Sequence, residues 1–267
     1  MSQSNIVGRP PTTLTNELYI EEKSPNHIRL AAVGDIHCTE RSQKMVSSMF
    51  SGIEKRSDVL LLCGDITDRG RTNEMEVLIN VLTKALDTGL TILAVLGNHD
   101  YHSGEERKLV ALMRQAGIRV LFEDDNIFVL NDRVGFCGVK GFWGGFSSTK
   151  IMAFGEEQVK ELIKETVRDV RRLNKGLRSL STPEKVALLH YAPIKQTLRG
   201  EPAELMNLLG SDLLAGPLDE QGATLAFHGH AHFGKYNGLT NGGVPVYNVA
   251  APVLRRSGLR PPCIHLI

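Results

Sequence analysis

The chain has 267 residues, of which 42% are hydrophobic and 23% are charged, and 31 basic against 30 acidic residues give a formal net charge of +1. This composition predicts one large domain with a substantial core, and the balanced charge excludes a global field that would attract duplex nucleic acid or an anionic membrane. No uncharged apolar stretch is long enough to span a bilayer, so we expect a soluble, cytoplasmic protein without a membrane partner. The four cysteines lack the spacing of a disulfide framework or a zinc knuckle, which favours free thiols.

The first part of the chain differs in character from the rest. Residues 1–26 contain Pro10-Pro11 among mixed polar residues, and we expect them to form a flexible or loosely draped extension. Residues 27–267 are predicted to form a single domain. The sequence gives no indication of the oligomeric state.

From residue 27 onwards, short apolar runs alternate with amphipathic segments, which is the pattern of an α/β fold. The apolar runs predict strands at 27–33, 58–63 and 91–96. Apolar residues at helical spacing predict helices at 43–56, 73–88 and 105–116.

The pattern changes between residues 118 and 141, where short strands and turns at Asp124-Asp125 and Asn131-Asp132 follow one another without a helix. We expect this meander to cross from one half of the fold to the other. The segment 156–173 predicts a long amphipathic helix. Its arginines are diluted by acidic residues, so a solvated helix surface is favoured over a nucleic-acid face.

Side chains of the kinds that bind metals follow five of the apolar runs. The ends of buried strands open onto the crevice where α/β sheets bind ligands, so residues distant in sequence can meet there. Carboxylate, imidazole and amide donors suit Mn, Fe or Zn, whereas calcium prefers a cage of oxygens. The candidate ligands are Asp35, His37, Asp65, Asn98, His190, His230 and His232.

The order of these residues resembles that of the calcineurin-like metallophosphoesterases. The matching blocks are Asp-x-His at 35–37, Gly-Asp-x-x-Asp at 64–68, Gly-Asn-His-Asp at 97–100, a histidine at 190 and Gly-His-x-His at 229–232. The resemblance implies an α/β fold, a four-layer αββα sandwich with mixed β-sheets, and two divalent metal ions as cofactors.

The resemblance also implies a role for each ligand. One ion would be held by Asp35, His37 and His232, and the other by Asn98, His190 and His230. Asp65 would bridge the two ions, and His99 would face the substrate instead of a metal.

Two ions about 3.5 to 4 Å apart can share a water and lower its pKa toward neutrality, which predicts attack of a metal-bridging hydroxide on phosphorus. His99 would protonate the departing oxygen, and Asp100 would orient His99. Arg69 completes a Gly-Asp-Ile-Thr-Asp-Arg-Gly block similar to that of the Ser/Thr protein phosphatases, in which the arginine grips phosphate; a solvent-facing turn residue is the alternative. Asp68 is expected either to support these groups or to cap a turn.

The substrate class depends on the last histidine block. The complete Gly-His-x-His separates the chain from the Ser/Thr protein phosphatases and resembles phosphodiesterase-type members, closest to the class III cyclic-nucleotide phosphodiesterases. His190 lies in His-Tyr-Ala-Pro, where those enzymes often have paired histidines. We expect a phosphodiesterase that acts on small soluble, nucleotide-type esters and not on duplex DNA. A phosphomonoesterase of protein phosphatase type and a non-catalytic binding scaffold are the alternatives.

Two further features have less specific interpretations. The segment Gly141–Phe146 contains the only tryptophan, and it forms either a wall of the substrate cleft or a tight loop over the core. His228 matches no residue of the family pattern, and we expect a strand residue satisfied by hydrogen bonds.

Overall fold

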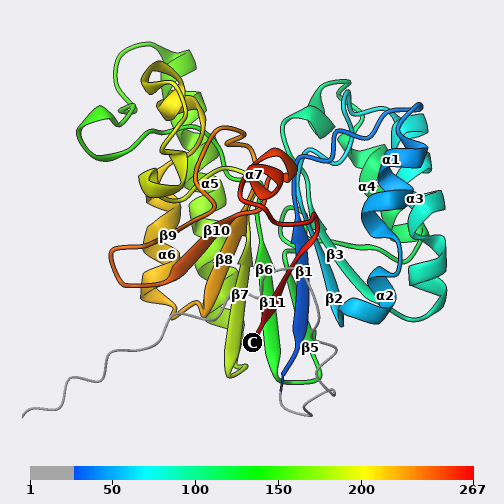
Figure 1. The fold of residues 1–267 in the computed structure, drawn as a ribbon. Helices are drawn as coiled ribbons and strands as arrows, with labels where there is room; N and C mark the ends of the chain where they lie inside the picture. The colour runs from blue at the N-terminus through cyan, green and yellow to red at the C-terminus, as the bar shows by residue number, and fades with distance from the viewer. Residues whose placement is uncertain (1–26) are drawn as a thin grey trace, which may run out of the picture.

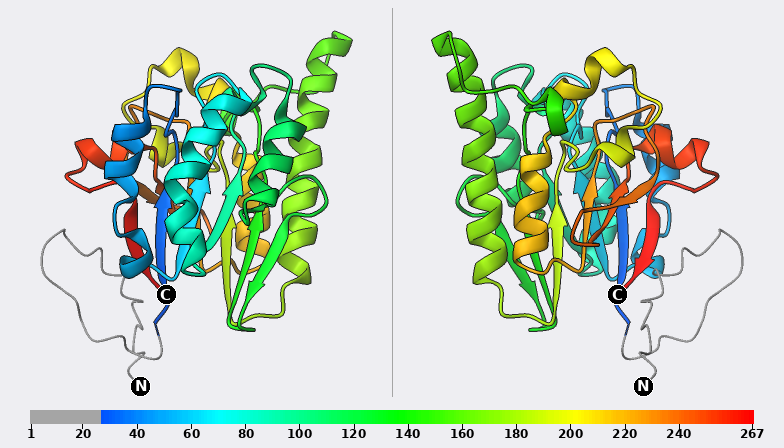
Figure 2. Two further views of the ribbon diagram at one scale, coloured as in Figure 1. Left: turned by 90° about the vertical axis from the view of Figure 1, so that its right-hand side faces the viewer. Right: turned by 90° about the vertical axis from the view of Figure 1, so that its left-hand side faces the viewer.

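The computed structural model describes residues 27–267, so the predicted extension over residues 1–26 lies outside the described residues. Two β-sheets face each other at the centre, and helices cover the outer face of each sheet (Figures 1 and 2). This is the αββα sandwich with mixed sheets that the sequence predicted. Within the described residues, no helix combines the length and the apolar composition needed to cross a membrane.

The first sheet has five strands in the order β11-β1-β2-β3-β4. Its central strands are β1 (Arg29–Val33), β2 (Val59–Cys63) and β3 (Thr91–Val95), which run parallel to one another. All residues of β2 are buried, as expected for an apolar strand covered on both faces. The short strand β4 (Arg119–Val120) extends the parallel order, and β11 (Cys263–Leu266) pairs antiparallel with β1 at the opposite edge.

Helices between these strands cover the outer face of the first sheet, on the right of Figure 1. They are α1 (Gln43–Phe50), α2 (Ile53–Arg56), α3 (Thr72–Asp87) and α4 (Glu106–Gln115). The single helix predicted for 43–56 is interrupted at Gly52, which has a left-handed backbone with φ of 66°. A helix cannot continue through such a residue, so the segment divides into α1 and α2.

The second sheet has six strands in the order β5-β6-β7-β8-β10-β9. Their bounds are Ile127–Leu130 (β5), Val134–Gly138 (β6), Glu184–Leu188 (β7), Leu225–His228 (β8), Asn237–Leu239 (β9) and Pro245–Asn248 (β10). The predicted meander does cross between the halves, because β4 belongs to the first sheet and β5 to the second. Asn131 and Asp132 both have positive φ in the three-residue connection between β5 and β6, where Arg133 N donates to Leu130 O over 3.0 Å.

The outer face of the second sheet is covered by α5 (Glu157–Ser179) and α6 (Ala215–Glu220), on the left of Figure 1. The helix α5 is longer than the predicted 156–173 because its last turns pack on β6. A Cβ added at Gly176 would lie 2.4 Å from Cys137 Sγ, so glycine permits this close approach inside the helix. The remaining helix, α7 (Ala251–Arg256), follows β10.

Short 3-10 helices lie in the long connections near the carboxyl ends of the strands. They are η1 (His99–Tyr101), η2 (Ser147–Thr149), η3 (Lys195–Leu198), η4 (Ala203–Leu208) and η5 (Asp212–Leu214).

The main core lies between the two sheets and extends under the helices of the first sheet. Alternate residues of the second sheet point to opposite sides: Phe136 of β6 belongs to this core, and Cys137 belongs to the core under α5. The two sheets also meet by hydrogen bonds at their carboxyl ends, where Gly34 N donates to Val249 O over 2.9 Å. Loops from both sheets therefore converge at one edge of the sandwich.

Candidate metal centre

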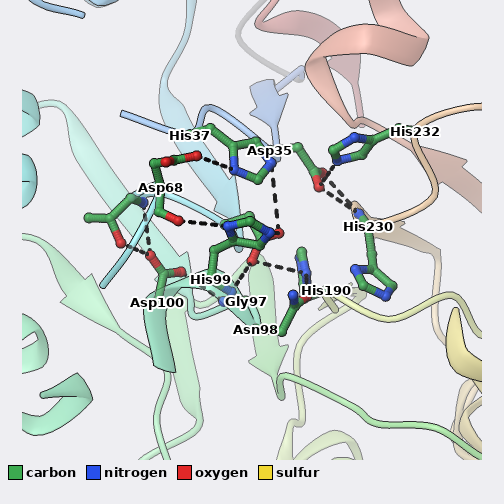
Figure 3. A network of polar contacts seen from close by, with 12 residues as sticks. Asp35, His37, Asp68, Gly97, Asn98, His99, Asp100, His190, His230 and His232 are labelled. Atoms are coloured by element: carbon green, nitrogen blue, oxygen red, sulfur yellow. Dashed lines mark hydrogen bonds and ion pairs between the residues drawn. The ribbon is translucent and has the colours of Figure 1, made fainter. Parts of the chain in front are cut away.

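The residues predicted as metal ligands lie together at this edge, directly after β1, β2, β3, β7 and β8. Figure 3 shows their side chains pointing toward one another, with hydrogen bonds and ion pairs between them. Three groups of donors have their ligand atoms within 4.8 Å of one another. These groups are Asp35–His37–His232, Asp65–His190–His230 and His37–Asp68–His99.

The backbone at these positions is unusual. Asp35, His37, Asp65 and His230 have φ between 46° and 68°, in the left-handed region that costs energy for residues other than glycine. Such strained residues persist where the surrounding structure holds them, and they cluster at functional sites. The strain turns each side chain from the strand end into the shared space.

Glycines next to the ligands are required because other ligand residues lie too close to them for a side chain to fit. A Cβ at Gly97 would lie 2.2 Å from Asp65 Oδ1, and a Cβ at Gly64 would lie 2.4 Å from His190 Nδ1. The glycines of the Gly-Asp and Gly-Asn blocks therefore allow the ligand loops to pack against one another.

The first group joins the loop after β1 to the loop after β8. Asp35 is buried, and its carboxylate accepts hydrogen bonds from the His230 amide, over 3.0 Å and 2.9 Å, and contacts His232 Nε2 at 2.8 Å. Burial raises the pKa of Asp35, but the hydrogen bond from His232 and the neighbouring imidazoles outweigh it and lower this pKa to about 2. Asp35 is therefore an anion.

In the second group, His190 is fixed at both ring nitrogens. Its Nδ1 donates to Cys63 O at 3.0 Å, because a carbonyl only accepts, so Nε2 carries the lone pair. This Nε2 faces Asn98 Oδ1 at 3.0 Å and Asp65 Oδ1 at 3.3 Å. Burial and the neighbouring His230 hold the pKa of His190 well below its usual value, so the ring is neutral. Electron-pair donors that converge in this way fit a cation bound between them.

His230 is oriented by a backbone carbonyl from η4. Its Nε2 lies 3.3 Å from Leu208 O, so Nε2 carries the proton and Nδ1 is free to bind a metal. Burial lowers the pKa of His230 to about 4, which keeps the ring neutral.

Asp65 lies between the two groups. Its Oδ2 is 3.8 Å from His37 Nε2, and its Oδ1 faces His190. Burial and repulsion from Asp35 and Asp100 raise the pKa of Asp65 to about 9. The His37 Nε2 is itself buried without a hydrogen-bond partner. A buried carboxylate with unfavourable neighbours and an orphaned imidazole nitrogen both fit divalent cations bound on either side of Asp65.

His99 is beside the metal ligands and more open to solvent, with 41% of its side chain exposed. Its Nδ1 donates to Asp68 O at 2.7 Å, which leaves Nε2 facing the cluster, 4.0 Å from Asp65 Oδ2. Asp68 also places its carboxylate 3.5 Å from His37 Nδ1. The structure thus places Asp68, rather than the expected Asp100, next to the His99 ring.

Asp100 has a different environment from the one expected. Its buried carboxylate accepts hydrogen bonds from the amides of Gly97, Ile66 and Thr67 and from the Thr67 hydroxyl, over 2.7 to 3.2 Å. It therefore ties the loop after β3 to the loop after β2. Asp100 holds ligand loops in place and does not contact the His99 imidazole through any of these bonds.

Arg69 lies next to Asp68, with its Nε 3.7 Å from Asp68 Oδ2. The structure brings it to the loop that carries His99, since Ser103 donates to Arg69 O over 2.6 Å. Its side chain is 60% exposed, so solvent surrounds most of the guanidinium.

The segment Gly141–Phe146 packs on the core and also approaches the ligands. Phe142 and Trp143 stack on each other, with ring centroids 5.3 Å apart, and both pack against the core under α5. Phe142 also contacts Tyr191, whose ring lies 4.3 Å from the His230 ring. His228 is a buried strand residue with hydrogen bonds to Gly229 O and Thr197 Oγ1, as expected.

Lys140 was missed by sequence reasoning. It follows the apolar strand β6, as the ligands follow theirs, and this position was the available signal. Burial lowers the pKa of its ammonium, while the negative charges of Asp169, Glu165 and Asp65 act in the opposite direction. Lys140 therefore lies within electrostatic range of the proposed bridging ligand.

A sandwich of mixed sheets with metal-type donors gathered at one edge is the architecture that the resemblance to the metallophosphoesterases implied. The chain belongs to the calcineurin-like phosphoesterase family, whose model matches residues 28–234. No curated protein matches the sequence.

Several solved structures share the fold. Phosphopantetheinyl hydrolase (PptH) from Mycobacterium tuberculosis is 15% identical with a TM-score of 0.64, over 89% of this chain and 95% of that one. TT1561 of Thermus thermophilus is 14% identical with a TM-score of 0.55, over 85% and 90%. GAP50 of Plasmodium, described as the anchor in the inner membrane complex, is 12% identical with a TM-score of 0.52, over 85% and 72%. At these identities the likeness shows the fold alone.

Proposed function

We propose that this chain is a metal-dependent phosphodiesterase that hydrolyses small, soluble, nucleotide-type phosphate esters. The observation that carries the proposal is the convergence of Asp65 with donors from four other strand ends, beside a half-exposed His99. Family membership supports phosphoester chemistry in general. The ester class rests on the complete Gly-His-x-His block and on the balanced charge of the chain.

The donor set fits two divalent ions such as Mn, Fe or Zn. When bound, these ions would supply Lewis-acid chemistry at the phosphoryl group. Asp35, His37 and His232 would hold one ion, and Asn98, His190 and His230 would hold the other. Asp65 would contact both, because its two carboxylate oxygens face different groups of ligands.

His99 would act as the general acid. Its Nδ1 proton is held by Asp68 O, so Nε2 is the ring nitrogen directed toward the cluster. The imidazolium form would give its Nε2 proton to the leaving oxygen and keep the proton on Nδ1. The carbonyl of Asp68 would orient the imidazole, and Asp100 would keep the loops of Asp65 and His99 in register through its backbone contacts. Arg69 would approach the ester from the solvent side.

A phosphomonoesterase and a non-catalytic binding scaffold are the alternative functions for this site. A phosphomonoesterase would need additional positive charge for the second negative charge of its substrate, and a binding scaffold would need no acid beside the ligands. The exposed position of Arg69 favours a diester, and the oriented His99 favours an enzyme. Duplex nucleic acid is not an expected substrate, because the chain lacks the excess of basic residues that such binding draws on.

The test is a parallel assay of bis(p-nitrophenyl) phosphate and p-nitrophenyl phosphate with the manganese-loaded protein. We expect faster turnover of the diester. The Asp65→Asn variant controls for contaminating activity, since it lacks the shared ligand. Faster turnover of the monoester, abolished in Arg69→Ala, would establish a phosphomonoesterase instead. Binding of manganese without turnover of either ester would indicate a non-catalytic binding scaffold.

A further inference from the structure

Lys140 lies next to two of the ligand-bearing loops, those after β3 and β7. Its Nζ is 4.4 Å from the ring centroid of Phe142, 5.2 Å from that of Tyr191 and 5.4 Å from that of Tyr101. Tyr101 follows His99 in η1, and Tyr191 directly follows His190. Ring faces attract a cation, so the three aromatic side chains hold the ammonium next to the loops of Asn98 and His190.

The backbone of Lys140 is fixed to the same loops. Its carbonyl accepts hydrogen bonds from the His190 amide at 3.1 Å and the Tyr191 amide at 3.0 Å. The backbone of Lys140 therefore has a fixed position relative to His190, and the ring contacts and the bond to Gly141 O place its ammonium.

Lys140 forms no ion pair among the described residues, although the negative charges of Asp169 and Glu165 on α5 and of Asp65 act on its ammonium. Its Nζ donates to Gly141 O at 3.0 Å, and among residues 27–267 no carboxylate oxygen lies within 4.0 Å of it. The nearest acidic helix, α5, directs the Asp169 carboxylate to the Gly141 amide and to Arg172 instead. The ring of Tyr191, 5.2 Å from Nζ, lies 4.3 Å from the ring of His230 and 5.4 Å from that of His190, so one aromatic side chain separates the ammonium from these two ligands. A ring shields a charge far less than an ion pair does.

We propose that Lys140 is a specificity-determining residue, whose fixed ammonium favours phosphate anions at the metal centre in proportion to their negative charge. The inference rests on the proposed function, and it adds a second cation to Arg69. Lys140 is half-buried, whereas Arg69 is 60% exposed, so solvent screens Arg69 more strongly. The interaction energy doubles from a monoanion to a dianion, so Lys140 sets how well the site accepts monoesters relative to diesters.

The same charge has an opposite effect on the metals. An ammonium close to Asp65 repels divalent ions, so its removal strengthens metal binding while it weakens anion binding. If Lys140 had only a structural role, its removal would weaken metal binding, because loss of the loop contacts would loosen the ligands. The sign of the change in metal affinity therefore separates the two roles.

The experiment compares Lys140→Met and Lys140→Arg with the wild type and with Lys84→Met. Lys84 is 80% exposed on α3 and controls for the loss of one lysine charge. Manganese affinity is measured by calorimetry, followed by binding of inorganic phosphate as a dianion at pH 8 and of dimethyl phosphate as a monoanion. Circular dichroism and thermal unfolding check that each variant folds; Lys140→Gln replaces Lys140→Met if the latter does not.

We expect Lys140→Met to bind manganese more tightly, to lose roughly tenfold in phosphate affinity and to lose about threefold in dimethyl phosphate affinity. Lys140→Arg should remain close to the wild type, because it keeps the charge. Weaker manganese binding in Lys140→Met, or equal losses for the two anions, would overturn the proposal. If the wild type hydrolyses no ester, the proposed function fails, but these binding measurements still decide the role of Lys140.

Discussion

The two sets of ligands proposed to hold the ions differ in exposure. Asn98, His190 and His230 form the inner group, and Asp35, His37 and His232 form the outer group. In the inner group, the side chain of His190 is 0% exposed and both of its ring nitrogens have fixed neighbours. In the outer group, the side chains of His37 and His232 are 22% and 35% exposed. The ligands of both groups follow strand ends, so the difference indicates that the histidines of the outer group lie closer to solvent than His190 does.

The largest loss of metal and activity is expected from a change at Asp65, which lies between the two groups. Asp65→Asn removes one negative charge from between the groups, so we expect both ions to be lost and hydrolysis to fall to background. Metal analysis of the purified variant checks this result. Retention of both ions at wild-type affinity would remove Asp65 from the shared position.

His99→Ala should leave both halves of the metal site intact and remove the acid. We expect a loss of about 10² to 10⁴ in kcat for alkyl esters, with a smaller loss for aryl esters, whose leaving groups need little protonation. Steady-state kinetics with both ester types, together with metal content, test this expectation. Equal losses for the two types would argue against a proton from His99.

The two halves should release their ions at different rates. With an excess of a chelator such as dipicolinate, we expect a fast phase from the more exposed outer group and a slow phase from the inner group. His232→Ala should remove the fast phase, and His190→Ala should remove the slow phase. Release in one phase in the wild type would show that the halves do not differ as their exposure suggests.

The smallest difference between the two groups is expected in the free energy of unfolding of the metal-free protein. His190→Ala leaves the buried Cys63 carbonyl without its donor and should cost roughly 1–3 kcal/mol in the free energy of unfolding. His232→Ala affects a partly exposed side chain and should cost less than about 1 kcal/mol. Urea unfolding of the metal-free variants measures both values, and a greater cost for His232→Ala would reverse the comparison.

The ligands of both groups follow apolar strands, which the sequence locates. Strands such as β2 are continuous apolar runs, so their ends, and the ligands that follow, could be located by residue type alone. The interruption at Gly52 and the last turns of α5 depended on a left-handed residue and on contact with β6, which local patterns do not show.

The roles of supporting residues were the least predictable. Adjacency suggested that Asp100 orients His99, but the chain turns so that the Asp100 carboxylate meets backbone amides and the Asp68 carbonyl meets the imidazole. The Leu208 carbonyl that orients His230 belongs to a distant segment, and a backbone group gives no signal in residue type. Such contacts follow from the assembled fold.

The most direct test of the central claim is turnover of bis(p-nitrophenyl) phosphate by metal-free protein as manganese is added in measured equivalents. If both halves of the site act together, activity remains low up to one equivalent per chain and rises as the second equivalent binds. Full activity at one equivalent, or no turnover at any amount of manganese, would contradict a phosphodiesterase built on both groups of ligands.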